Sequence, residues 1–307
     1  MLSDSKILVT GAAGQIAFPM ARLLAESNEV WGLARFSAPD SREKVTDVGI
    51  IPVACDLATG DFRDVPDDFD YVIHLAAAMP PGLDYDAAIA ANAEGTGLLL
   101  QHCRTAKAAL VMSTFSIYKP QPDPMYVFAE SAPLGDVNAA HAPSYSVSKI
   151  GQEAVARFCA RAFDLPIALA RMNASYGPNG GLPAMHADLI AAGSPVTTRW
   201  EPCMYSPIYE DDINIQAAAL LDAASVPATI VNWAGDEPVS AQDWCAYAGE
   251  LLGVTPEVIV KPVDETLRGS ISDNTKRLAI TGPCSVDWRE GIRRTIAARH
   301  PGRTRRQ

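Results

Sequence analysis

A tyrosine and a lysine four residues apart, Tyr145 and Lys149, are the residues of this sequence whose types and spacing could do chemistry. On a helix this spacing places a phenol and an ammonium group on one face, so the lysine can lower the pKa of the tyrosine. Such a tyrosine could exchange a proton near neutral pH. Because the pattern Tyr-x-x-x-Lys also arises by chance, it needs support from the rest of the chain.

A glycine-rich segment near the start of the chain gives that support. The apolar run Ile7–Val9 is typical of a buried parallel strand, Gly11 and Gly14 follow it, and the apolar spacing of Ile16–Ala25 predicts a helix. Such a turn lets the backbone approach a pyrophosphate, whose charge faces the N–H groups of the helix start. The spacing is G-x-x-G, with Ala17 where a third glycine often stands. Taken alone, the segment could equally be a plain tight turn.

Further apolar runs alternate with helical stretches, which indicates an α/β fold with a Rossmann-type, doubly wound parallel sheet. The predicted strands are Val30–Leu33, Ile50–Val53, Tyr71–Leu75, Ala109–Met112 and Ile167–Leu169. After Gly177 the pattern changes: residues 178–183 predict a loop, residues 195–207 an irregular segment, and Ser240 and Gly253 the limits of a helix. We therefore expect a dinucleotide-binding domain over 1–176, joined again by 208–236. A smaller C-terminal α/β substrate domain would take 177–207 and 237–307.

Composition limits the possible functions. The chain has 307 residues, 48% hydrophobic and 20% charged, with a net charge of -11. These values are typical of a globular protein that repels nucleic acid and anionic membranes. We find neither a membrane-spanning apolar run nor a secretion signal, so we predict a cytoplasmic location. The six cysteines form no C-x-x-C pair and the five histidines no H-x-x-x-H pair, which argues against a metal site or a disulfide framework.

Taken together, the motifs resemble those of the extended short-chain dehydrogenase/reductase family, also described as NAD-dependent epimerase/dehydratase. The resemblance covers nearly the whole chain, and the matching segments occur in the order of the family. They are Gly11–Gly14, Asp56–Leu57, His74–Ala77, Asn92–Thr96, Ser113–Tyr118, Tyr145 with Lys149, Arg171 with Tyr176–Pro178, Asp211–Asp212, and Asp273 with Lys276.

The resemblance implies roles for individual residues. Tyr145 would exchange a proton with the substrate oxygen, Lys149 would tune it and hold the nicotinamide ribose, and Thr114, with Ser113 as the fallback, would hydrogen-bond the same oxygen. Asp56 would contact adenine. Asn92 would either hold the cofactor loops or belong to a proton relay, and His74 is more simply a polar group at a strand end. The cofactor-binding residues would be Gly11, Gly14, Gln15, Ile16, Arg35, Asp56, Leu57, Leu75, Ala76, Ala77, Asn92, Tyr145 and Lys149.

Three departures from the family pattern carry functional information. Ala34–Arg35 follows the second predicted strand, where NAD-binding members have an acidic residue, so we expect NADP to be preferred over NAD. Phe115 and Ser116 stand where sugar dehydratases have an Asp-Glu pair, which argues against elimination of water. Tyr205 stands where nucleotide-sugar epimerases have a phosphate-binding arginine, and only Arg199 or Arg268 could compensate.

Three functions remain open. The first is an NAD(P)-dependent oxidoreductase that interconverts an alcohol and a carbonyl on a small, partly apolar substrate. The second is a nucleotide-sugar 4-epimerase, and the third is a cofactor-binding sensor without catalysis. The sensor is disfavoured because cofactor binding alone does not require Tyr145, Lys149 and Thr114. We expect substrate contacts from Met79, Phe115, Tyr176, Trp200 and Tyr205. The resemblance also implies a homodimer that pairs the helices of residues 92–107 and 149–163 with their copies.

Overall fold

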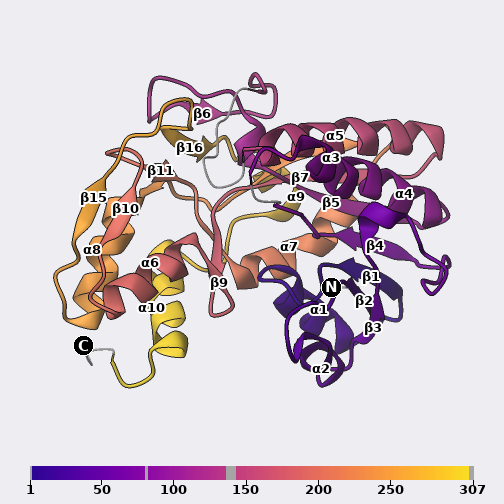
Figure 1. Cartoon of the computed structure of the whole chain (residues 1–307), viewed down its shortest axis with the longest axis horizontal. Helices are drawn as coiled ribbons and strands as arrows, with labels where there is room; N and C mark the ends of the chain where they lie inside the picture. The colour runs from indigo at the N-terminus through magenta and orange to yellow at the C-terminus, as the bar shows by residue number, and fades with distance from the viewer. Residues whose placement is uncertain (1, 80–81, 136–142, 304–307) are drawn as a thin grey trace. The chain divides into compact units, whose positions relative to one another are not determined.

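The computed structural model describes residues 2–79, 82–135 and 143–303 (Figure 1). The chain divides into two compact units that interleave along the sequence. The first unit takes residues 1–117, 139–171 and 214–231, and the second takes residues 118–138, 172–213 and 232–307. The chain therefore passes from one unit to the other several times.

A seven-stranded sheet makes up most of the first unit. Its strands lie in the order β13 (Thr229–Trp233), β7 (Ile167–Met172), β5 (Ala108–Thr114), β4 (Tyr71–His74), β1 (Lys6–Thr10), β2 (Glu29–Ala34) and β3 (Ile51–Ala54). The pairings of β1 with β2, β1 with β4, β2 with β3 and β4 with β5 are parallel. Strand order reverses between β1 and β4, and such a switch point is where doubly wound sheets bind ligands. The sheet confirms the predicted fold class, and each predicted apolar run overlaps an observed strand.

Helices cover both faces of this sheet, with α3, α4 and α5 on one side and α1 and α2 on the other (Figure 1). Their bounds are α1 (Ala17–Ala25), α2 (Ser41–Thr46), α3 (Tyr85–Ile89), α4 (Gly95–His102) and α5 (Tyr145–Ala162), with α7 (Glu210–Asp222) running on into the first unit. Shorter turns are the 3-10 segments η1 (Leu57–Thr59) and η3 (Phe115–Ile117) and the π-helical η2 (Ala90–Glu94). Between sheet and helices, fully buried side chains such as Leu8, Val72 and Leu99 form the core, whose burial stabilises the fold.

Over its described residues, the second unit contains three small sheets and four helices of its own. The sheets are β14 (Val239–Ser240), β11 (Met204–Tyr205), β16 (Gly269–Ser272) and β6 (Val127–Phe128); β12 (Ile208–Tyr209), β8 (Ser175–Gly177) and β9 (Gly180–Gly181); and β10 (Val196–Thr198) with β15 (Val258–Val260). The helices are α6 (Leu182–Ala191), α8 (Ala241–Leu252), α9 (Thr275–Thr281) and α10 (Trp288–Arg299). Buried Trp244 and Trp288 belong to its core.

Helix α8 begins and ends at the residues that the sequence predicted, Ser240 and Gly253. The Ser240 hydroxyl accepts from Asp243 N at 2.9 Å in a capping box, and Gly253 takes the left-handed conformation with φ 71°. Both devices satisfy backbone groups that a helix end leaves unpaired.

The structure differs from the predicted organisation in three places. Residues 118–138 were expected in the first domain, but β6 pairs with β16, as Val127 lies opposite Ile271. The expected loop over 178–183 contains β9 and the first turn of α6, where Pro183 sits without cost because the first turn needs no N–H partner. The expected irregular segment over 195–207 contains β10 and β11.

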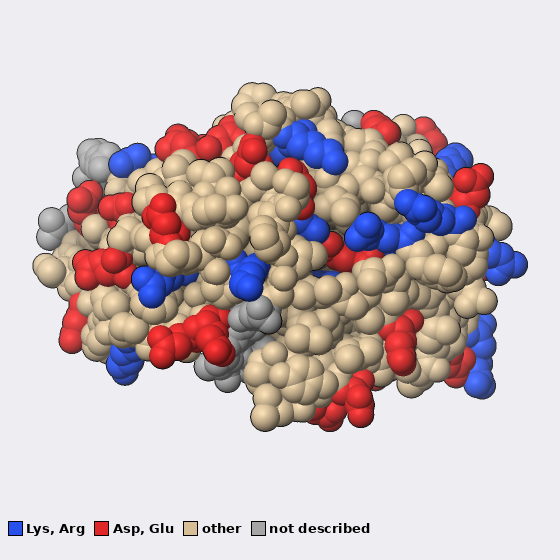
Figure 2. All heavy atoms as spheres, turned by 90° about the horizontal axis from the view of Figure 1, so that it is seen from above, with Lys and Arg blue, Asp and Glu red and all other residues tan. Residues whose placement is uncertain are grey.

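Acidic and basic side chains are intermixed on the face shown in Figure 2. Among the described residues, no helix combines the length and the apolar character needed to cross a membrane. Within the same ranges, no cluster of three or more His, Cys, Asp or Glu side chains could hold a metal ion.

Candidate active site

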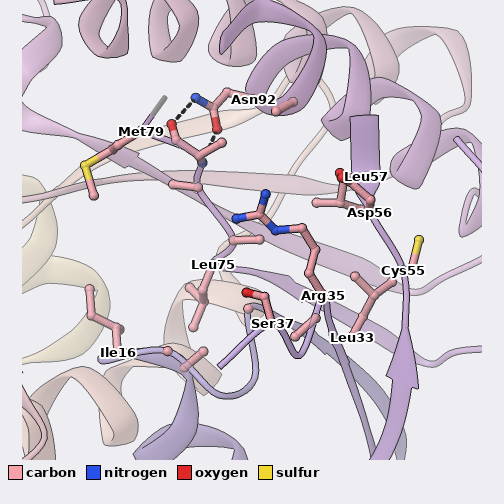
Figure 3. Close-up of a pocket in the computed structure, with 18 of the residues that line it drawn as sticks. Ile16, Leu33, Arg35, Ser37, Cys55, Asp56, Leu57, Leu75, Met79 and Asn92 are labelled. Atoms are coloured by element: carbon pink, nitrogen blue, oxygen red, sulfur yellow. Dashed lines mark hydrogen bonds between the residues drawn. The ribbon is translucent and has the colours of Figure 1, made fainter. Parts of the chain in front are cut away.

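A cavity of about 480 Å³ opens at the switch point of the seven-stranded sheet, entirely within the first unit (Figure 3). Its lining includes every predicted cofactor residue except Tyr145 and Lys149: Gly11, Gly14, Gln15, Ile16, Arg35, Asp56, Leu57, Leu75, Ala76, Ala77 and Asn92. Met79, expected to contact substrate, also lines it. Sequence reasoning missed Ser37, Cys55 and Met112, which line the cavity because they flank the predicted residues at strand ends.

Gly11 makes the close approach of the turn possible. It has φ +72°, and a Cβ atom there would lie 3.1 Å from Ala76 Cα and 3.2 Å from Ala76 N. A Cβ on Gly14 would lie 2.9 Å from the carbonyl oxygen of Gly11. Helix α1 then begins with neither an acidic side chain in its first turn nor a side-chain cap. The turn is therefore a cradle of small residues beside helix N–H groups, which fits a dinucleotide pyrophosphate.

The end of β2 supplies a positive charge to the cavity. Figure 3 shows the Arg35 side chain extending into the cavity from this strand end, with Ser37 beside it. Asp56 also lines the cavity, where its carboxylate accepts a hydrogen bond from Ala58 N at 3.1 Å and caps η1. A guanidinium and a hydroxyl at this position are groups that can bind a phosphate.

Asn92 ties the loop after β4 to the helix that carries Tyr145. Its side chain accepts from Ala78 N at 2.7 Å, and its amide donates to Ala78 O at 2.8 Å (Figure 3). The same amide donates to Ser148 Oγ at 2.9 Å. Asn92 lies in η2, where the π-helical turn occurs at a functional cavity as such turns often do. Through these contacts Asn92 holds the loop after β4 against α5, and its two expected roles toward a cofactor or a proton relay stay predictions.

Lys149 and Tyr145 lie on α5. Lys149 is completely buried, and its Nζ donates to the carbonyl oxygen of Met112 at 2.7 Å. Burial lowers the pKa of Lys149 to about 7, while the charge of Glu153 opposes the change. Burial raises the pKa of Tyr145 to about 12, and a hydrogen bond with Thr114 works against this rise. Desolvation of the phenol is thus the largest effect on the pKa of Tyr145, and the expected influence of Lys149 on this pKa stays a prediction.

Thr114, at the end of β5, is the hydroxyl that meets Tyr145. Ser113, the fallback, is buried with its Oγ unpaired. The alternation of side chains along a strand explains the difference, because neighbouring residues point to opposite faces of the sheet. Thr114, Tyr145 and Lys149 thus come together in the first unit.

His74 belongs to a buried polar network under this group. Its Nδ1 and Nε2 lie 2.7 Å from the hydroxyls of Thr10 and Thr96 respectively, and Gln152 Nε2 donates to Thr96 Oγ1 at 3.0 Å. Burial and the charge of Lys149 lower the pKa of His74 to about 3. The imidazole is therefore neutral at pH 7, and it joins β1, β4 and α5 as a structural polar group.

The other residues expected to contact substrate differ in their surroundings. Phe115 is buried in the first unit. In the second unit, Tyr176 is buried and its hydroxyl donates to the carbonyl oxygen of Trp288 at 3.2 Å, which makes it a core residue. Tyr205 is partly exposed and packs on Trp244 with ring centroids 5.2 Å apart.

Two arginines of the second unit lie beside these aromatic residues. The Arg268 guanidinium lies 4.6 Å from the ring centre of Trp200. Burial raises the pKa of the Tyr205 hydroxyl, and the positive charge of Arg199 opposes this rise. We refer to Arg199, Trp200, Tyr205 and Arg268 as the arginine–aromatic cluster.

The chain belongs to the NAD dependent epimerase/dehydratase family, whose model matches residues 7–195. The whole chain is similar to solved epimerases. UDP-glucose 4-epimerase from Thermus thermophilus, in complex with NAD, has 25% sequence identity and a TM-score of 0.81, with 97% of this chain and 99% of that chain covered. UDP-glucuronic acid 4-epimerase from Bacillus cereus, in complex with UDP-glucuronic acid and NAD, has 21% identity and a TM-score of 0.82, with 95% and 98% covered. Comparison with curated protein sequences gives no match.

Gly11→Ala should weaken binding of the nicotinamide dinucleotide and destabilise the fold, because the new methyl group meets the Ala76 backbone at a positive φ. The backbone conformation alone costs about 1–2 kcal/mol. Gly49→Ala is the matched control, since Gly49 has φ +82° but open space around it. Urea unfolding should show a loss of stability in both variants, whereas cofactor titration by fluorescence should show a loss only in Gly11→Ala. Equal cofactor affinity in the two variants would contradict the assignment of the turn.

Proposed function

We propose that the chain catalyses hydride transfer between a nicotinamide dinucleotide and a hydroxyl-bearing carbon of its substrate. The observation that carries the proposal is the meeting of Thr114, Tyr145 and a completely buried Lys149 beside the cavity at the sheet switch point. The family membership of the chain agrees with it. When bound, the nicotinamide supplies the hydride acceptor or donor.

The residues of the chain would handle the proton that accompanies the hydride. In the reducing direction Tyr145 would give its phenolic proton to the carbonyl oxygen as the hydride arrives and become a phenolate. In the oxidising direction that phenolate would take the hydroxyl proton as the carbonyl forms. Thr114 would donate a hydrogen bond to the same oxygen as charge develops on it. Lys149 would stabilise the phenolate of Tyr145 during the transfer. Gly11, Gly14 and Arg35 would hold the dinucleotide, with Asn92 fixing the loop at Ala76–Ala78.

Of the two possible outcomes, we place first the epimerisation of a nucleotide sugar at C4, in which the hydride returns to the opposite face of the ketone. Three solved structures of similar fold are UDP-sugar 4-epimerases that act on such substrates. The arginine–aromatic cluster supports this outcome, because Arg199 and Arg268 offer cations for a pyrophosphate near the position where Tyr205 replaces an arginine. This ordering reverses the expectation from sequence alone.

Net oxidation or reduction of a small, partly apolar substrate is the second candidate. It is favoured by Tyr205, which has no positive charge of its own where nucleotide-sugar epimerases have an arginine. A buried pyrophosphate that lost that bidentate partner would bind poorly unless Arg199 or Arg268 took its place.

Tyr145→Phe should keep cofactor affinity and lower turnover by roughly 10²-fold or more, because it removes only the proton-transferring hydroxyl. The assay supplies UDP-glucose, UDP-glucuronic acid or UDP-N-acetylglucosamine with catalytic NAD or NADP, then simple ketones and alcohols. Sugar products are separated chromatographically, and reduced nicotinamide is followed by absorbance.

Conversion to the 4-epimer without net reduced cofactor, lost in Arg268→Ala, would establish the epimerase. Stoichiometric cofactor turnover on a carbonyl or alcohol, with all UDP-sugars inert, would establish the second candidate. Near-normal turnover in Tyr145→Phe would overturn both candidates.

We propose that NADP binds more tightly than NAD, although the similar structures described above hold NAD. Ala34 and Arg35 replace the carboxylate that would repel a 2′-phosphate, and Ser37 adds a hydroxyl on the same side of the cavity. Ala34→Asp should reverse the preference, as measured by the two dissociation constants. Arg42→Gln, also on the exposed surface after β2, is the control and should leave the ratio unchanged. If the unmodified protein binds NAD more tightly than NADP, the proposal is wrong, and Arg35 is then a solvated loop residue without a role in cofactor choice.

We also propose a homodimer through α4 and α5, which pack against one another. Their surfaces expose Leu98, Val147 and Phe158, the last with 66% of its surface accessible. Exposed apolar side chains gathered on one pair of helices are typical of an interface. Phe158→Glu should shift sedimentation at micromolar concentration from dimer to monomer. Met185→Glu, at a similarly exposed methionine of α6, should leave the dimer intact.

A further inference from the structure

A row of four ionisable side chains runs from the catalytic tyrosine into the core of the first unit. Tyr145, Lys149 and Glu153 follow one another at four-residue steps on α5, which places them along one stripe of the helix. At the end of the row, Arg171 on β7 donates from Nε to Glu153 Oε1 at 2.9 Å and from its terminal nitrogen to Oε2 at 2.8 Å. Both side chains of this pair are only 3% exposed.

The row matters because Lys149 has little else to balance its charge. Its Nζ donates to a neutral acceptor, the carbonyl oxygen of Met112 on β5. The ionisable groups that face it are Tyr145 and Glu153 on its own helix and His74 on β4. Tyr145 and His74 are neutral at pH 7, since their pKa values are about 12 and about 3. Glu153 is therefore the anion that faces Lys149 in the resting protein.

We infer that Glu153, held in place by Arg171, keeps Lys149 protonated and is thereby a positioning residue for the acid–base pair. The inference rests on the proposed function, in which Tyr145 transfers the proton. The bidentate contact with Arg171 fixes the position of the Glu153 carboxylate. When Tyr145 becomes a phenolate, the ammonium then stands between two anions.

A carboxylate within a helical turn of a buried ammonium raises its pKa by about one to three units. With Glu153 in place, burial brings the pKa of Lys149 to about 7, so the loss of this one facing carboxylate would change the charge of the lysine near neutral pH. Without Glu153, the lysine would be neutral at pH 7 and could not stabilise a phenolate on Tyr145. A purely structural tie between α5 and β7 would stabilise the fold but would leave the titration of Lys149 unchanged.

The direct test measures the titration of Lys149 in the unliganded protein by carbon NMR of labelled lysine side chains. The chain has seven lysines, and Lys149→Met identifies the signal by its loss. In Glu153→Gln the titration midpoint of Lys149 should fall by about one to three units. Arg157→Gln is the matched control: Arg157 stands four residues beyond Glu153 on the same helix but is exposed, so the midpoint should stay where it is.

Two further variants separate charge from packing, and circular dichroism confirms folding in each. Arg171→Lys keeps the positive charge but loses the bidentate geometry, so it should lower stability while leaving the Lys149 midpoint near its native value. The double variant Glu153→Gln with Arg171→Met removes the buried pair as a whole, a change that folded proteins tolerate better than an unpaired charge. Its midpoint should lie below the native value and above that of Glu153→Gln, because the uncompensated Arg171 cation is gone.

Turnover gives a second readout. The alkaline limb of the rate–pH profile should move down by the same shift as the NMR midpoint in Glu153→Gln. An unchanged Lys149 midpoint in the double variant, or in Glu153→Gln where it folds, would overturn the inference. Full turnover in Tyr145→Phe would instead overturn the proposed function, while the NMR titration would still report on Glu153, so the two failures are distinguishable.

Discussion

The burial of one ammonium group, that of Lys149, is the constraint around which the first unit is arranged. A buried charge is costly unless neighbouring groups compensate it. The Met112 carbonyl from β5 and the carboxylate of Glu153, one turn further along α5, supply the compensation, and the first of these contacts requires β5 to lie at a fixed distance from α5. The strand end that carries Met112 also carries Thr114, and Met112 lines the cavity at the switch point of the sheet. One desolvated cation thus links sheet, helix and cavity.

Several other buried polar groups of this unit are also paired by hydrogen bonds. His74, Thr10, Thr96 and Gln152 exchange hydrogen bonds in the core beside Lys149, and the imidazole stays neutral because burial disfavours its charged form. A neutral network satisfies buried donors and acceptors without adding a second cation near Lys149. Asn92 adds to these polar contacts by holding the loop at Ala78 with two hydrogen bonds.

Local sequence patterns predicted what depends on local geometry. The strand runs, the glycine turn at Gly11, the cap at Ser240 and the four-residue step from Tyr145 to Lys149 all follow from the spacing of neighbouring residues. Effects that depend on distant partners escaped prediction. The pKa of Tyr145 rises because the whole environment removes water from it. The contact from Asn92 to Ser148 joins residues 56 positions apart. The pairing of β6 with β16 gave no signal, since a two-residue strand has too few side chains to show a period.

That last pairing has a consequence for how the protein forms. Val127 of β6 is synthesised long before its partner Ile271 in β16, and β16 in turn lies beside β11. Until β16 has been synthesised, the edge of β6 has no strand to pair with, and the second unit cannot complete its four-stranded sheet before residues 269–272 are made. Contacts so distant in sequence slow folding, because a long loop must close before they form. The first unit also needs residues 214–231, so neither unit can be made as one uninterrupted fragment. If synthesis stops before residue 269, the released chain contains parts of both units. The first unit then has all of its strands, whereas the second unit lacks β16.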